Sequence, residues 1–262
     1  MPRIMGILNV TPDSFSDGGS FTSKETVTDQ VERMLEDGVD IIDVGGESTR
    51  PFAEPVTEAE ELARVIPAIR IIREITDCPV SIDTTKAEVA RRALAAGADM
   101  INDISGLRHD PAMAAVVAGY DGPVIIMHMQ GTPGDMQVNP RYDDVVADIC
   151  SFFKERLTWM QQQGIDSDRI VIDPGIGFGK TLDHNLEILR NIKQFKKLGQ
   201  AVLIGHSRKS FLEKLLDLPI TERDCATAIL SALCAVQGAD ILRVHDVRLT
   251  RQALTLAAAM QG

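Results

Sequence analysis

Polar residues that can accept hydrogen bonds lie at the ends of short apolar runs in this sequence. Asp83, Asn102 and Asp173 each end or follow such a run. Any one of them alone would be read as a cap of a helix or turn. Several together would cost much free energy if buried without partners, so a set that converges on one site needs cations or a ligand. Carboxylates and an amide suit a flat heterocycle that carries N–H donors, such as an amino-pyrimidinone edge.

A second set of residues suits an anion. The segment 'GHSRKS' at 205–210 places Lys209 and Ser210 at the start of a predicted helix, and Arg243 and His245 close another apolar run. Helix starts and basic side chains behind the last strands of a barrel commonly bind phosphate. Asn9 adds a neutral oxygen of the kind that Mg²⁺ accepts beside substrate phosphates.

The elements that position these residues alternate between strand and helix. Eight apolar runs rich in Ile and Val predict buried parallel strands, separated by helix-periodic stretches. They are Ile4–Leu8, Ile41–Val44, Val80–Ile82, Met100–Ile104, Val124–Met127, Ile170–Ile172, Ala201–Ile204 and Ile241–Val244. We therefore predict an α/β fold, a single (β/α)8 TIM barrel over residues 1–262 with extended loops after strands one and two. A doubly wound open sheet is the alternative.

Composition narrows the class of partner. The formal charge of −11 and a pI near 4.9 argue against an extended nucleic-acid surface. No apolar run approaches the roughly 18 residues of a membrane span. Four scattered cysteines without a C-x-x-C pair indicate reduced thiols, so we expect a cytoplasmic protein that binds small molecules and neither nucleic acid nor membrane.

Three tempting motifs are set aside. 'DPGIGFGKT' ends like a phosphate-binding loop, but Pro174 occupies the position of the required first glycine. The histidines His128, His206 and His245 are dispersed and lack cysteine companions, which disfavours zinc. Ser207 has no obvious His–Asp pair in the sequence, so nucleophilic serine chemistry is not expected.

Eight motifs together resemble one known family. In chain order they are 'GILNVTPDSFSDGG', 'DVGGESTRP', 'SIDTTK', 'INDISG', 'MHMQGTP', 'DPGIGFGK', 'SRKSF' and 'RVHDV', spanning Met5 to about Arg248. They are similar to the motifs of the dihydropteroate synthases, transferases of folate biosynthesis that sulfonamides inhibit. The resemblance implies a barrel that joins 7,8-dihydropterin-CH₂-pyrophosphate to para-aminobenzoate, giving 7,8-dihydropteroate and pyrophosphate.

The resemblance also implies roles for individual residues. The pterin would contact Asp83, Asn102, Met127, Asp173, Phe178, Gly205 and Lys209. Pyrophosphate would contact Asn9, Thr49, Arg50, Arg243 and His245, with Asn9 also the ligand of Mg²⁺. The aminobenzoate would contact Phe15, Thr49, Pro51, Lys209 and Ser210. The catalytic set would be Asp83, Asp173 and Lys209.

The implied chemistry is an S_N1-like loss of pyrophosphate, assisted by Mg²⁺, that leaves a cationic methylene on the pterin. Segments Thr11–Gly19 and Gly46–Pro55 would exclude water until the arylamine arrives. Phe52 departs from the glycine that most family members carry after 'STRP'. The late Ala- and Leu-rich segments Cys225–Val236 and Leu254–Met260 would form a homodimer interface.

Two other functions fit part of the pattern. A pterin-dependent methyltransferase domain would share the barrel and the acidic pocket, but it would not need 'SRKS' or the 'STRP' segment. A non-catalytic pterin-binding protein would bind the ligand without releasing pyrophosphate. Both anion-binding strand ends favour the synthase over these alternatives.

Overall fold

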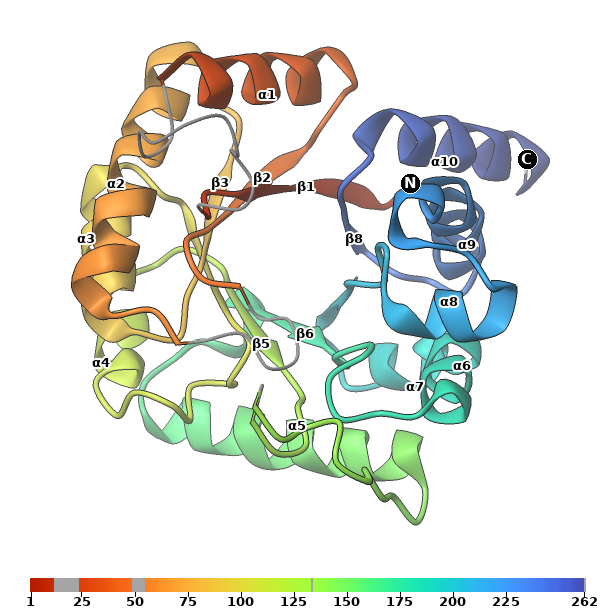
Figure 1. Cartoon of the computed structure of the whole chain (residues 1–262). Coiled ribbons are helices and arrows are strands. Elements are labelled where there is room, and N and C mark those ends of the chain that lie inside the picture. Colours follow the sequence, from red (N-terminus) through yellow and green to blue (C-terminus); the bar gives the residue numbers. More distant parts are fainter. Residues whose placement is uncertain (12–23, 49–54, 133, 262) are drawn as a thin grey trace.

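Eight parallel strands close into one barrel in the computed structural model (Figure 1). The structure describes residues 1–11, 24–48, 55–132 and 134–261. The strands are β1 Arg3–Asn9, β2 Ile41–Gly45, β3 Val80–Asp83, β4 Met100–Asp103, β5 Val124–Met127, β6 Ile170–Asp173, β7 Ala201–Ile204 and β8 Ile241–Val244. Each strand pairs with its sequence neighbours, and β1 pairs with β8. The predicted barrel is confirmed, and the open-sheet alternative is wrong.

Helices surround the strands. They are α1 Lys24–Glu36, α2 Glu58–Ile75, α3 Ala87–Ala96, α4 Met113–Ala118, α5 Val145–Gln162, α6 Leu182–Arg190, α7 Ile192–Lys196, α8 Ser210–Leu216, α9 Asp224–Val236 and α10 Val247–Gln261. In the part of the chain that the structure describes, short 3₁₀ turns occupy Ser167–Arg169 and Ile220–Glu222. The sequence did not predict α7, which follows α6 after a single residue, Asn191.

A further long connection follows β5. The extended loops predicted after β1 and β2 lie largely outside the described residues, whereas residues 128–144, described except for 133, connect β5 to α5. Helix α5 begins at Val145 behind the N-cap Asp144. Asp144 accepts hydrogen bonds from the Val146 and Ala147 backbone N–H groups, which fixes the helix start.

Aspartates before three strands stabilise the lower end of the barrel. Each accepts a hydrogen bond from the backbone N–H of the preceding strand and pairs with a basic side chain. The groups are Asp40 with Ile4 and Arg251, Asp99 with Val80 and Arg73, and Asp240 with Val202 and Lys196. These residues come from the repeated segments 'DGVD', 'GADM' and 'GADI'. The repeat therefore has a structural role at the face opposite the strand ends.

Apolar side chains fill the lower interior of the barrel, whereas the polar side chains of the predicted site lie at the mouth. One buried cluster inside the barrel consists of Met5, Ile41, Met100, Ile125, Val171, Leu203 and Ile241. A larger cluster fills the layer between the strands and the helices. Strands buried on both faces explain why the apolar runs in the sequence are continuous.

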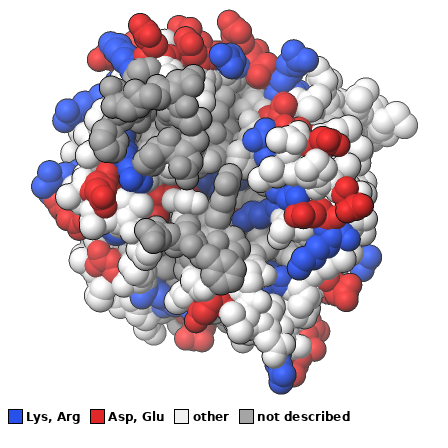
Figure 2. Space-filling model, viewed as in Figure 1, with Lys and Arg blue, Asp and Glu red and all other residues white. Residues whose placement is uncertain are grey.

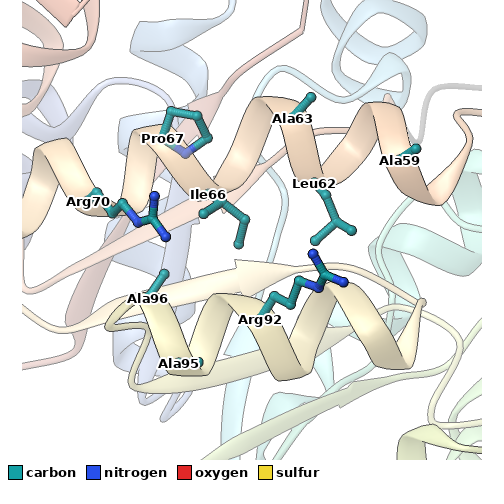
Figure 3. A pocket seen from close by; sticks show the side chains of 9 residues that line it. All are labelled: Ala59, Leu62, Ala63, Ile66, Pro67, Arg70, Arg92, Ala95 and Ala96. Carbon is teal, nitrogen blue, oxygen red and sulfur yellow. The ribbon is translucent and has the colours of Figure 1, made fainter.

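A groove on the outer surface separates α2 from α3 (Figure 3). It encloses about 580 Å³ and is lined mainly by alanine and aliphatic side chains such as Leu62 and Ile66. Arg70 and Arg92 also line it, and Arg92 pairs with Glu88 at 2.6 Å. None of the predicted site residues borders this groove, so the chemistry lies elsewhere.

Candidate active site

The strand register places the predicted acidic residues at one level of the mouth. Asn9 pairs with Gly45, Gly45 with Asp83, and Asp83 with Asn102, across β1 to β4. On the opposite side, Met127 of β5 pairs with Asp173 of β6. Because all carboxyl ends of the parallel strands meet here, residues far apart in the chain share one rim. Figure 2 shows Lys and Arg side chains beside the hollow of this face, with many acidic side chains toward its outer edge.

An ion-pair network crosses the mouth. Arg243 Nε donates to Asp43 Oδ2 at 2.6 Å, and Arg243 Nη2 donates to Asp83 Oδ2 at 2.6 Å. Asn102 Nδ2 lies 3.3 Å from the same Asp43 oxygen. Burial lowers the pKa of Arg243, but Asp43 and Asp83 outweigh that effect and hold it above its ordinary value. Asp43 is not among the predicted site residues, although it contacts two of them, Arg243 and Asn102.

The carboxyl group of Asp83 is perturbed by this environment. Burial raises its pKa from 3.8 to about 7, with the Arg243 cation opposing the rise and Asp43 and Glu61 adding to it. Because burial disfavours the ionised form of Asp83, a ligand that brings hydrogen-bond donors or positive charge would stabilise its carboxylate.

The second wall combines Asp173 with Lys209. Asp173 Oδ1 accepts a hydrogen bond from Gly175 N at 2.8 Å, yet burial raises its pKa to about 6. Lys209 Nζ lies 3.9 Å from the centre of the Phe178 ring, and burial lowers its pKa to about 8. Gly177 has a φ of +82°, and a Cβ there would come within 3.1 Å of the Lys209 side chain. The absence of a side chain at Gly177 therefore leaves room for the Lys209 side chain.

The turn after β7 presents Lys209 and Ser210. Arg208 adopts a φ of +56°, an unfavourable conformation for a residue other than glycine. Its guanidinium makes two hydrogen bonds to Asp224 of α9, at 2.6 and 2.7 Å, and its backbone N–H donates to Thr227 Oγ1. These contacts hold the strained turn and fix Lys209 as the N-cap of α8.

Ser207 and His245 form a pair that the sequence did not predict. Ser207 Oγ lies 2.8 Å from His245 Nδ1. Burial, with Arg208 and Arg243 nearby, lowers the pKa of His245 to about 3. Ser207 thus has a histidine partner that the sequence did not reveal, but a histidine of such low basicity is a poor general base.

Lys180 is a buried cation that the sequence analysis missed. Its Nζ lies 2.9 Å from the Phe178 carbonyl oxygen, 3.4 Å from the His128 carbonyl oxygen and 3.1 Å from His128 Nδ1. Burial lowers the pKa of Lys180 to about 7 and that of His128 to about 2. Lys180 ends the motif 'DPGIGFGK', of which the predicted site includes only Asp173 and Phe178. It ties the loop that carries Phe178 to the end of β5.

Asn9 is the predicted ligand of Mg²⁺. Its Oδ1 would lie 3.7 Å from a Cβ on Gly45, and Asp83 Oδ2 would lie 3.8 Å from the same point but is held by Arg243. A neutral amide oxygen suits Mg²⁺, which keeps most of its waters and takes few protein ligands. Within the described ranges, no group of three His, Cys, Asp or Glu side chains is placed to hold a metal ion.

Several predicted residues cannot be placed. Phe15, Thr49, Arg50, Pro51 and the unusual Phe52 lie outside the described residues. The predicted segments Thr11–Gly19 and Gly46–Pro55 are described only at residues 11, 46–48 and 55.

The start of the second of these segments is anchored. Glu47 accepts a hydrogen bond from Val56 N at 3.3 Å, and Lys86 Nζ pairs with Glu47 at 2.5 Å and with the buried Glu61 at 2.6 Å. The Arg64 guanidinium donates to the Gly46 carbonyl oxygen at 2.8 Å. The two ends of the connection after β2 are thus tied together beside the mouth.

Comparison with known proteins gives a consistent picture. Residues 5–245 match the family described as pterin binding enzyme. The dihydropteroate synthase of Synechocystis is 47% identical over 98% of this chain and 89% of its own. A Yersinia pestis dihydropteroate synthase, in a complex with a sulfonamide drug, is 42% identical with a TM-score of 0.94, covering 99% of this chain and 94% of the other. The Xanthomonas albilineans enzyme in complex with 7,8-dihydropteroate is 43% identical with a TM-score of 0.90, covering 100% and 94%.

The chain therefore belongs to the pterin-binding enzymes. Among these it is a member of the dihydropteroate synthase family, transferases of folate biosynthesis and targets of sulfonamides. The family predicted from the eight motifs is confirmed, together with its barrel and its enzymatic function. The methyltransferase and non-catalytic alternatives find no support among these relatives.

Proposed function

We propose that the protein condenses 7,8-dihydropterin-CH₂-pyrophosphate with para-aminobenzoate at the barrel mouth, releasing pyrophosphate. The observation that carries this proposal is the meeting of buried carboxylates and cations on one rim, where Arg243 bridges Asp43 and Asp83. Relatives with the same fold have been crystallised with the arylamine 4-aminobenzoic acid and with the product 7,8-dihydropteroate.

The pterin binds between the two walls of the mouth. Its N–H edge donates to Asp173 and its ring system meets Asn102, Met127 and Phe178. Asp173 and Asn102 are nearly inaccessible to water, with exposed fractions of 7% and 4%, which makes each hydrogen bond to the ligand strong. Gly205 leaves space beside Asp173, because a Cβ there would approach Asp173 Oδ2 to 3.5 Å.

Pyrophosphate leaves by an S_N1-like step. Asp83 lies at the rim beside the expected cationic methylene, and its ionised form stabilises that charge. Arg243 and His245 receive the departing anion, and Lys209 adds positive charge on the same side. Asn9 would hold Mg²⁺, which would supply positive charge to the departing pyrophosphate.

The arylamine attacks the cation without the help of a strong base, because a neutral aromatic amine is already nucleophilic. Ser210 and Lys209, at the start of α8, bind its carboxylate. Thr49, Pro51 and Phe15 complete this part of the site in the proposal, and Arg50 assists pyrophosphate binding.

The exposed faces of α9 and α10 support a homodimer. Ile229, Leu233 and Val236 form one stripe on α9, with Leu233 57% exposed. Leu256 and Met260 lie on the neighbouring α10, and the two helices pack side by side (Figure 1). Large apolar side chains gathered on adjacent helices are typical of a protein interface. A second copy of the chain is the proposed partner.

The proposed location is the cytoplasm. Cys78, Cys150, Cys225 and Cys234 are all unpaired thiols, as expected in a reducing compartment. Among the helices of the described ranges, none has the length and apolar character needed to cross a membrane. We propose small molecules as the only substrates, with neither nucleic acid nor membrane as a partner.

The proposed reaction is tested by pyrophosphate release. Purified protein receives the dihydropterin pyrophosphate and Mg²⁺, with and without para-aminobenzoate. Rapid release that depends on the arylamine, together with dihydropteroate formation, supports the proposal. Tight binding of the pterin substrate without product would instead identify a pterin-binding protein with no transferase activity.

A further inference from the structure

Ser207 makes two hydrogen-bonding contacts with one residue, His245. Its Oγ lies 2.8 Å from His245 Nδ1, and the backbone N–H of His245 donates to the same Oγ at 3.2 Å. Ser207 follows β7 and is only 5% exposed, whereas His245 follows β8 and is half-buried. The serine therefore holds the Nδ1 edge of the imidazole ring.

The position of the protons follows from these contacts. A serine hydroxyl has one proton, and its only acceptor within the described residues is His245 Nδ1. If Nδ1 carried a proton, the two hydrogens would compete and the buried hydroxyl would lose its acceptor, which is unfavourable. The arrangement thus favours an unprotonated Nδ1 that accepts from Ser207.

We propose that Ser207 is a positioning residue that holds His245 in the tautomer protonated at Nε2, so that the ring offers an N–H donor to the departing pyrophosphate. This inference rests on the pyrophosphate role proposed for His245. A neutral imidazole has one donor and one acceptor nitrogen, so occupying Nδ1 as the acceptor makes Nε2 the donor.

The charges around the ring keep it neutral. Arg208, Arg243 and Lys209 face His245 with positive charge, and Asp224 is the nearby acid. Together with burial, these cations disfavour the doubly protonated ring at neutral pH. Lysine and arginine therefore supply positive charge to the site, whereas the neutral His245 ring donates one hydrogen bond, from Nε2, to pyrophosphate.

The tautomer is measured directly, without substrate. Protein labelled with ¹⁵N-histidine is studied by long-range ¹H–¹⁵N NMR at pH 7.5, and His245 is assigned from its absence in His245→Gln. We expect a protonated Nε2 and an unprotonated Nδ1 in the wild type, and a mixture of tautomers in Ser207→Ala. A wild-type ring protonated at Nδ1 would overturn the inference.

A binding measurement then connects the tautomer to function. The affinity for magnesium pyrophosphate, measured by calorimetry, is expected to fall about three- to tenfold in Ser207→Ala. The same substitution in the His245→Gln background, where the glutamine amide replaces Nε2–H, is expected to have no further effect. An equal loss in both backgrounds would contradict a role through His245.

Ser81→Ala is the matched control. It removes a buried hydroxyl that has no hydrogen-bond partner, so pyrophosphate affinity and the His245 tautomer should both stay unchanged. Circular dichroism of each variant checks that the barrel is intact. If wild-type protein fails to bind magnesium pyrophosphate, both this inference and the proposed function are wrong. A ring protonated at Nδ1 refutes the tautomer assignment alone.

Discussion

Asp173→Asn is expected to abolish activity while making the protein more stable. Burial raises the pKa of Asp173 from 3.8 to about 6, a net effect that already includes the attraction of Lys209 and Arg243. At ~1.4 kcal/mol for each tenfold change in proton affinity, the ionised carboxylate costs the folded state about 3 kcal/mol at neutral pH. An asparagine removes that charge and keeps an oxygen that can accept from Gly175 N.

The sign of the pH dependence makes this prediction specific. Because the folded-state pKa lies above the unfolded one, Asp173 lowers the stability of the wild type as pH rises from about 4 to about 6. Urea unfolding at pH 4, 5, 6 and 8 should therefore show similar stability for both proteins at pH 4. By pH 8 the variant should be more stable by about 1–3 kcal/mol.

The same variant should lose dihydropteroate formation, since the asparagine replaces one acceptor oxygen by an NH2 donor, which cannot accept a hydrogen bond from the N–H edge of the pterin. A variant less stable than the wild type at pH 8, or a stability difference that does not change with pH, would refute the reasoning. Wild-type activity in Asp173→Asn would refute the assignment of this residue to the pterin.

Three further predictions follow from the site and the surface. The rate at low pterin substrate should fall below about pH 7, as Asp83 takes up a proton, and above about pH 8, as Lys209 loses one; a profile flat from pH 6 to 9 would contradict these roles. Lys180 has a pKa lowered to about 7, so wild-type stability should rise between pH 7 and 10 as the unfolded chain holds that proton longer. Lys180→Met should lose most of that rise in urea unfolding, and an unchanged rise would be evidence against a buried cation. Leu233→Glu should weaken the proposed dimer about a hundredfold in sedimentation experiments while circular dichroism stays unchanged, whereas an unaltered association would place the interface elsewhere.

Much of the site could be predicted because parallel strands impose a common order. Once continuous apolar runs are recognised as strands buried on both faces, the residue after each run must lie at one rim. This reasoning predicts that Asp83, Asn102 and Asp173 share one rim, and the register places Asp83 beside Asn102 and, across the mouth, Asp173 beside Met127. The basic pair Lys209 and Arg243 followed from the same rule.

Other features depend on contacts that a linear pattern does not encode. Arg243 pairs with Asp43 across 200 positions of the chain, so the need for a bridging cation appears only when the barrel closes. Ser207 and His245 are separated by 38 positions and end neighbouring strands. Knowledge that β7 and β8 adjoin would have suggested this pair. The buried position of Lys180 was not predicted because its motif resembled a phosphate loop. Hydrophobic periodicity also gives no signal for a lysine that points inward.

The most direct test of the account compares aspartates at the two ends of the barrel. Dihydropteroate formation is measured for the wild type, Asp83→Asn at the mouth and Asp240→Asn at the lower end, with both substrates and Mg²⁺. Asp240 stabilises the fold through Val202 and Lys196, so its variant should be less stable by about 1–2 kcal/mol with unchanged turnover. The wild type and Asp240→Asn should form product that requires both substrates, and Asp83→Asn should form none. Absence of product from the wild type, or a wild-type rate from Asp83→Asn, would contradict the account.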